Sequence, residues 1–279
     1  MTIVLALVSA IVYGVSDYCG GRAARSAPVL LVTLVSLGVG LGVSSALVGL
    51  GSDPFPPGGD VAWGVAAGVM SLTGGASFYF ALANGAMTIV APVTAIVSAV
   101  VPVSVGVISG ERPSVLAVSG IVVALVAVAL VSGIAGRADR ATPLAVAVMA
   151  VVAGVGFGLL FVFLDRTSDE SGWWPIVIGQ VTSISIVATI VLVRRRPLDA
   201  PSRTYGLAAL AGATAVAANV CYVAAAREGL LSIVAVITSM YPATTVGLAT
   251  RLDGERVSRS QTVGLVGAVV ALAMVTAGS

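Results

Sequence analysis

Asp17 is a carboxylate within an otherwise apolar run at the N-terminus. An ionisable group at membrane depth is costly to desolvate and usually has a function. Tyr13 lies four residues earlier, on the same face if the run is helical. This pair indicates proton coupling or a counter-charge for a cationic solute. The alternative is that Asp17 reaches the interface and pairs with Arg22.

Polar and aromatic side chains recur in other apolar runs and form a second set of candidates. Asn219 and Tyr222 are three residues apart, which places them on one helical face. Such groups facing a cavity would bind a small amphipathic solute, whereas the alternative is helix packing and interhelical hydrogen bonding. The other candidates for substrate binding, with the same alternative, are Phe78, Tyr79, Thr94, Gln180 and Thr238.

Three prolines interrupt apolar runs and remove backbone donors, so they should kink their helices. Pro92 and Pro102 share one run, and Pro242 follows Tyr241 in another. In a moving bundle such kinks serve as hinges, which is the interpretation we favour over improved packing.

The amino-acid composition of the chain indicates a membrane protein. Of the 279 residues, 58% are hydrophobic and 9% are charged, with no His. Soluble domains carry about 25% charged residues. A soluble protein and a nucleic-acid binder are therefore excluded, and no cofactor or metal site is expected. The chain is predicted to lie in a lipid bilayer.

Ten apolar stretches are each about long enough to cross the bilayer as a helix. They do not alternate polar and apolar residues as barrel strands do, so we expect an all-α integral membrane protein. The stretches are residues 2–20, 29–51, 61–82, 88–109, 115–134, 144–164, 174–193, 205–226, 231–250 and 261–277.

The chain also repeats itself. A shift of 144 positions aligns residues 85–134 with 229–278 without a gap, and 17 of the 50 aligned pairs are identical. Glu111-Arg112 falls on Glu255-Arg256, each pair preceded by glycine. These four charged residues lie at helix junctions, where a carboxylate favours the helix dipole, so we read them as a structural signature.

The repeat predicts two five-helix domains, residues 2–134 and 142–277, within one membrane unit. Five is odd, so the second copy enters the membrane from the opposite side and the repeats are inverted. Many secondary transporters are built in this way, with the solute site at the repeat interface.

Two five-helix halves, each with Gly-Glu-Arg between its fourth and fifth helices, resemble the ten-helix EamA branch of the drug/metabolite transporter superfamily. The segment from Tyr13 to Gly21 resembles a bacterial subgroup of that branch. The resemblance implies a central cavity lined by the first, third, fourth, sixth, eighth and ninth helices. It also implies a multi-pass protein of the bacterial cytoplasmic membrane.

Arginines are distributed unevenly between the two sides of this arrangement. Eleven follow odd-numbered helices and three follow even-numbered helices. The positive-inside rule then places both termini outside the cytoplasm, whereas relatives of the EamA branch usually have both termini inside.

We expect a secondary active transporter that exports a small metabolite or drug-like solute by alternating access. Proton coupling through Asp17 and solute exchange are both open at this point, as are a monomer and a homodimer. No nucleic-acid partner is expected. An intramembrane enzyme or a non-transporting membrane component is the alternative. An enzyme would need paired carboxylates, a Ser/His pair or a metal set at membrane depth, whereas Asp17 is alone and His is absent.

Overall fold

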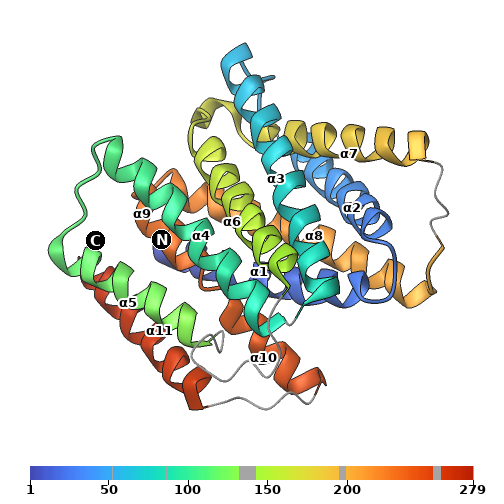
Figure 1. The fold of residues 1–279 in the computed structure, drawn as a ribbon. Helices are drawn as coiled ribbons and strands as arrows, with labels where there is room; N and C mark the ends of the chain where they lie inside the picture. Colours follow the sequence, from blue (N-terminus) through green and yellow to red (C-terminus); the bar gives the residue numbers. More distant parts are fainter. Residues whose placement is uncertain (52, 86, 132–142, 195–198, 254–258, 279) are drawn as a thin grey trace.

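The computed structural model describes residues 1–279 except 52, 86, 132–142, 195–198, 254–258 and 279, and the regular secondary structure in these residues is helical (Figure 1). Helices α1 to α5 form the first half of the chain, and α6 to α11 form the second. The bounds are α1 Thr2–Ala24, α2 Val29–Leu50, α3 Gly58–Asn84, α4 Met87–Ile108, α5 Val115–Val131, α6 Leu144–Asp165, the short 3-10 helix η1 Asp169–Ser171, α7 Trp174–Arg194, α8 Ser202–Ala226, α9 Leu231–Thr238, α10 Pro242–Asp253 and α11 Arg259–Gly278.

Prolines fix where several of these helices begin. Pro28, Pro57, Pro143 and Pro201 each stand directly before the first residue of a helix, at the starts of α2, α3, α6 and α8. A proline disfavours helical geometry at the residue before it, so a helix cannot extend backwards past the proline and starts beside it. The predicted breaks in the apolar pattern therefore coincide with helix starts.

Within the described residues, seven helical segments are long and apolar enough to cross a membrane. Three shorter apolar helices, Val93–Ile108, Val115–Ala127 and Thr262–Ala271, lie within other predicted spans. The chain is thus a multi-pass helical membrane protein. The expected boundary between the halves, at residues 134–142, lies outside the described residues.

The ninth predicted span is not one continuous helix. It is divided into α9 and α10, with the break at residues 239–241 directly before Pro242. Proline cannot donate the hydrogen bond that would continue the helix, which explains the position of the break. By contrast, α4 is continuous through both Pro92 and Pro102.

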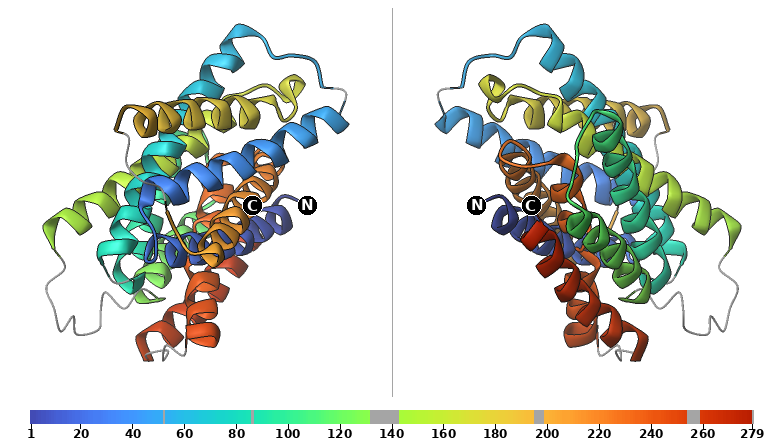
Figure 2. Two further views of the ribbon diagram at one scale, coloured as in Figure 1. Left: turned by 90° about the vertical axis from the view of Figure 1, so that its right-hand side faces the viewer. Right: turned by 90° about the vertical axis from the view of Figure 1, so that its left-hand side faces the viewer.

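The helices pack mainly across the two halves. Helix α1 packs on α8, and α3 packs on α6, forming the centre of the bundle. The pair α5 and α11 lies at one edge, whereas α2 and α7 lie toward the other, as Figures 1 and 2 show from three directions. Helix α4 packs on α6, and α9 and α10 pack on α1.

Small residues allow this close packing. A Cβ atom added at Gly154 of α6 would lie 2.5 Å from the Val97 Cβ atom of α4, and α7 approaches α3 where Gly179 meets Gly68. Serine hydroxyls tie α1 to α8, since Ser9 donates to the Ala218 carbonyl at 2.8 Å. Such small-residue contacts are typical of membrane helix pairs.

Arg227, at the end of α8, joins that helix to the connection between α6 and α7. Its Nε atom lies 3.0 Å from Asp169 Oδ1, and its Nη2 atom donates to the Gly172 carbonyl at 2.8 Å. The guanidinium carbon lies 5.4 Å from the centre of the Trp173 ring. These contacts close one end of the bundle beside α3 and α7.

Candidate functional site

A cavity lies between the two halves, in the middle of the bundle. It encloses about 850 Å³ of space between atoms, including its open mouth. Its walls come from α1, α2, α3, α6, α7 and α8, together with Tyr241 at the break between α9 and α10. The side chains and glycines that line it are Tyr13, Ser16, Asp17, Thr33, Ser36, Leu37, Ser71, Leu72, Gly75, Phe78, Tyr79, Phe157, Leu160, Phe161, Gln180, Ala211, Gly212, Ala215, Asn219 and Tyr241.

The structure brings six of the nine predicted substrate-binding residues together at this cavity. They come from both halves of the chain and from four different helices. These six are Tyr13, Asp17, Phe78, Tyr79, Gln180 and Asn219. Their role in binding a solute stays a prediction, but their gathering in one cavity is a structural fact.

Asp17 is buried, with 8% of its surface exposed, and it lines the cavity. Its carboxylate has no hydrogen bond or ion pair within the described part of the chain. Arg22, the partner in the alternative interpretation, instead donates to the Tyr18 hydroxyl at 2.8 Å. A carboxylate in this position is available to a proton or to a cation from outside the protein.

Tyr13 makes a direct link between the halves at the cavity wall. Its hydroxyl donates a 2.6 Å hydrogen bond to Asn219 Oδ1, so that α1 and α8 are joined by two side chains that also face the cavity. The Asn219 amide thus has a partner in the protein, as the packing interpretation requires, while it also faces the space that a solute would occupy.

Aromatic rings form much of the remaining wall. Phe78 of α3 meets Phe157 of α6 edge to face, with 5.8 Å between ring centres. Tyr13 meets Phe161 in the same manner at 5.9 Å. The Tyr79 hydroxyl packs against Gly20, one turn of α1 beyond Asp17 toward Arg22, where a larger residue would collide with the ring. The cavity therefore combines one carboxylate with several apolar ring surfaces.

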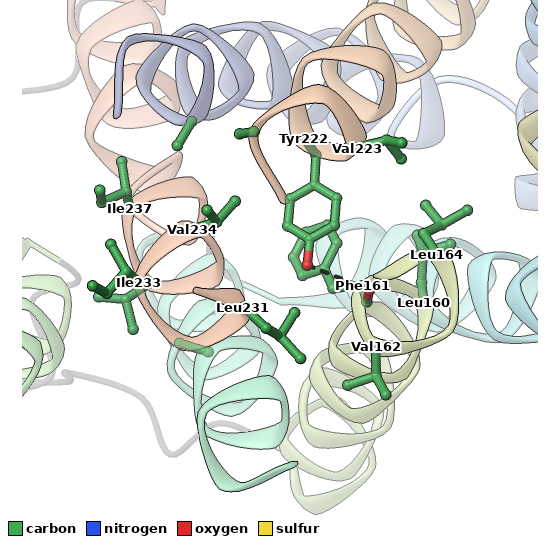
Figure 3. Packing of buried hydrophobic residues seen from close by; sticks show 14 of the residues in the cluster. Leu160, Phe161, Val162, Leu164, Tyr222, Val223, Leu231, Ile233, Val234 and Ile237 are labelled. Atoms are coloured by element: carbon green, nitrogen blue, oxygen red, sulfur yellow. Dashed lines mark hydrogen bonds between the residues drawn. The ribbon is translucent and has the colours of Figure 1, made fainter. Parts of the chain in front are cut away.

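Three predicted substrate-binding residues lie outside the cavity lining. Tyr222 is fully buried and stacks on Phe161 at 4.3 Å, with its hydroxyl donating to the Phe161 carbonyl at 3.3 Å (Figure 3). Thr94 is buried and donates to the Ala150 carbonyl of α6 at 3.0 Å. Thr238 is buried at the end of α9. Helix packing, the alternative interpretation, describes the contacts of Tyr222 and Thr94, whereas the Thr238 hydroxyl has no hydrogen-bond partner within the described residues.

The helices that line the cavity differ in part from those that the resemblance implied. Among its described residues, helix α4 contributes none to the cavity lining, and it packs on α6 at Gly154 and Gly158. Helices α2 and α7 take part instead, through residues such as Ser36 and Gln180. Pro92 and Pro102 therefore lie in a helix behind the wall, and a hinge role for either is still a prediction.

Several lining residues were not predicted from the sequence, among them Ser16, Ser36, Ser71, Phe157 and Phe161. The internal repeat was a signal that could have found some of them. Positions 144 residues after Tyr13 and Asp17 are Phe157 and Phe161, and the same shift takes Ser36 to Gln180. Phe157 and Phe161 are apolar, so without the repeat nothing in their chemistry distinguished them from other apolar residues as candidates for the site.

Glu111 lies at the start of α9, a helix other than the one that follows it in the chain. We expected the signature carboxylates to favour the helix that follows them in the chain. Instead, the Glu111 carboxylate accepts hydrogen bonds from the backbone N–H groups of Leu231 at 2.7 Å and Ser232 at 3.1 Å, at the start of α9. Arg112 is exposed, and Glu255 and Arg256 lie outside the described residues.

Comparison with known proteins agrees with this architecture. A solved structure described as "Crystal structure of protein" superposes with a TM-score of 0.76 at 16% identity, covering 99% of this chain and 96% of that one. This likeness shows the fold. No curated protein sequence gives a significant match. The sequence model of the EamA-like transporter family matches residues 1–133 and again residues 144–277. The chain accordingly belongs to the EamA-like transporter family, within the drug/metabolite transporter superfamily.

Proposed function

We propose that this protein is a secondary active transporter that exports a small metabolite or drug-like solute by alternating access. One observation carries the proposal: a cavity between the two halves of the bundle is lined from both of them and contains a buried carboxylate that no described residue pairs with. A solute site at the interface of two repeats is the usual design of such carriers.

The packing supports two related halves. In the repeat, α1 is equivalent to α6, α2 to α7, and α3 to α8. The contact of α1 with α8 therefore corresponds to that of α6 with α3, and the contact of α2 with α8 corresponds to that of α7 with α3. All four contacts are present. Lining positions follow the same relation. Pairs 144 residues apart that both line the cavity are Tyr13 and Phe157, Ser16 and Leu160, Asp17 and Phe161, Ser36 and Gln180, Ser71 and Ala215, and Gly75 and Asn219.

Asp17 is our candidate for coupling transport to a proton gradient. A buried carboxylate that binds either a proton or a solute, but not both, makes the two exchange across the membrane. The titratable groups that share the cavity with Asp17 are the phenols of Tyr13, Tyr79 and Tyr241. The Cys19 thiol and the Arg22 guanidinium lie further along α1.

The proposal is tested by solute flux in proteoliposomes, with and without an imposed proton gradient. We expect saturable movement of one class of labelled solute that responds to the gradient, and loss of that response in Asp17→Asn. Asp169→Asn is the matched control, because Asp169 is largely exposed at the end of the bundle. Gradient-independent movement would indicate a facilitator or exchanger and overturn the coupling step.

An intramembrane enzyme is the alternative class. It predicts chemical conversion of a solute rather than its movement, which chromatography of the same vesicle contents would detect. Absence of saturable flux across a broad panel, from protein that is folded by size-exclusion chromatography, would overturn the transport proposal.

The positive-inside rule supports an orientation in the bacterial cytoplasmic membrane with both termini outside. A reporter enzyme that is active only outside the cytoplasm, fused after Ser279, should therefore be active. An inactive external reporter together with a fluorescent cytoplasmic fusion would reverse this orientation.

A further inference from the structure

We infer that the cavity selects a monovalent organic cation, a protonated amine attached to an aromatic or apolar body. The inference rests on the proposed function, because it names the class of solute that the same site would carry. It depends on how charge, rings and hydrogen-bond acceptors are distributed around the cavity.

Helices α1 and α6, which are equivalent in the repeat, contribute unlike walls. The first half presents Asp17 and Ser16 from α1, and the second half presents Phe161 and Leu160 from α6 at the positions 144 residues later. One wall is therefore charged and polar, whereas the wall related to it is aromatic and aliphatic. A ligand that satisfies both walls has a polar head and an apolar body.

The charge of the head follows from Asp17. The carboxylate is buried, and the described lining residues include no arginine to neutralise it. A buried charge without a partner is unfavourable, and a cation bound beside it would offset that cost. An anionic head would instead meet a like charge in a medium of low dielectric constant.

The rings of the wall add to this preference. Tyr13 lies between Phe161 and Tyr241, with ring centres at 5.9 Å and 6.5 Å. Aromatic faces attract ammonium groups as well as apolar bodies, and the attraction grows when the site excludes water. The faces of these rings carry a partial negative charge and therefore do not attract a carboxylate or phosphate group.

Unused acceptors favour an amine that carries protons over a quaternary ammonium. Gln180 Oε1 is buried and has no hydrogen-bond partner within the described part of the chain, and the same holds for the Thr33 hydroxyl oxygen. Both residues line the cavity. A buried acceptor without a donor is unfavourable, and an N–H group of the ligand would supply the donor.

Equilibrium binding to the purified full chain tests the inference without requiring transport. The probes are 2-phenylethylammonium, its neutral analogue 2-phenylethanol and its anionic analogue 3-phenylpropanoate. We expect the ammonium probe to bind on the order of tenfold more tightly than the alcohol, as a charge-assisted contact should. The phenylethyltrimethylammonium ion, which has no N–H donor, should bind more weakly than the ammonium probe.

Asp17→Asn should reduce the affinity for the ammonium probe about tenfold and leave that for the alcohol unchanged, whereas Asp169→Asn should change neither. The comparison of probes on the wild-type chain needs no variant, so it decides the matter even if Asp17→Asn does not fold. Equal or tighter binding of the neutral or anionic analogue would overturn the inference while leaving the transport proposal intact. Gradient-driven flux tests transport separately.

Discussion

Glu111 Oε1 lies 2.7 Å from the backbone nitrogen of Leu231 and accepts its hydrogen bond, so a signature residue of the first half holds the start of a helix in the second. The other carboxylate oxygen accepts from the N–H group of Ser232 at 3.1 Å. The first N–H groups of a helix have no partner within it, and the helix dipole favours a negative charge there. The signature glutamate is thus a cap supplied from another part of the fold.

Glu111→Ala should therefore destabilise the protein. It leaves two buried backbone donors at the start of α9 without a partner, and we expect a loss of about 1–3 kcal/mol in the free energy of unfolding. Thermal unfolding of the purified protein in detergent measures the loss. Arg112→Ala is the matched control, because the neighbouring side chain is exposed. An equal effect of the two substitutions would show that the cap does not stabilise α9.

The Tyr13–Asn219 hydrogen bond should couple the two halves energetically. Tyr13→Phe removes the donor of the 2.6 Å bond, and Asn219→Ala removes the acceptor. In a double-mutant cycle on stability, we expect a coupling of about 1 kcal/mol. Tyr79→Phe combined with Asn219→Ala is the control pair, because no hydrogen bond joins those side chains, and it should be additive. Additivity in both cycles would mean that the bond contributes nothing to holding α1 against α8.

The sequence predicted much of the fold because the bilayer restricts backbone hydrogen bonding to helices, and because prolines fix their starts. Pro143 and Pro201 stand at predicted breaks and directly precede α6 and α8. The break at Pro242 followed from the same chemistry. Which helix Glu111 would cap could not be predicted, since Leu231 lies 120 residues away.

The site was predictable where the chemistry was conspicuous. One carboxylate, two amides and three aromatic residues that stood out in apolar runs line the cavity. Tyr222 is an aromatic residue three positions after Asn219, so the sequence placed it on the same helical face as that lining residue. In the structure it instead stacks on Phe161 in the core. The direction of a side chain depends on helix rotation, which nearly uniform hydrophobicity does not encode.

Gly154→Ala should loosen the contact between α4 and α6. The added Cβ atom would lie 2.5 Å from Val97 Cβ and 2.7 Å from the Thr94 carbonyl oxygen, so one helix must move. We expect a loss of about 1–3 kcal/mol, as for overpacked cores, visible as a lower melting temperature in detergent. Gly42→Ala is the matched control, because a Cβ at Gly42 of α2 has no atom within 4 Å. A melting temperature for Gly154→Ala equal to that of Gly42→Ala would contradict the close contact.

Arg227 should hold the end of the bundle mainly through its neutral partners. Its ionic partner Asp169 is 77% exposed, and an exposed ion pair contributes little. The Gly172 carbonyl and the Trp173 ring are further partners, and the ring contact depends on the planar guanidinium. Arg227→Gln should therefore release the segment between α6 and α7, whereas Asp169→Asn should not.

Hydrogen–deuterium exchange of residues 166–174 measures this release directly. We expect exchange in that segment to rise in Arg227→Gln and to stay near the wild-type rate in Asp169→Asn. Arg227→Lys should resemble Arg227→Gln, since an ammonium group keeps the charge but loses the planar fork. If Arg227→Lys and the wild type exchange alike while Asp169→Asn exchanges faster, the ion pair rather than the carbonyl and ring contacts closes this end. Because the segment connects α6 to α7, and both line the cavity, its release should also speed dissociation of any solute bound there.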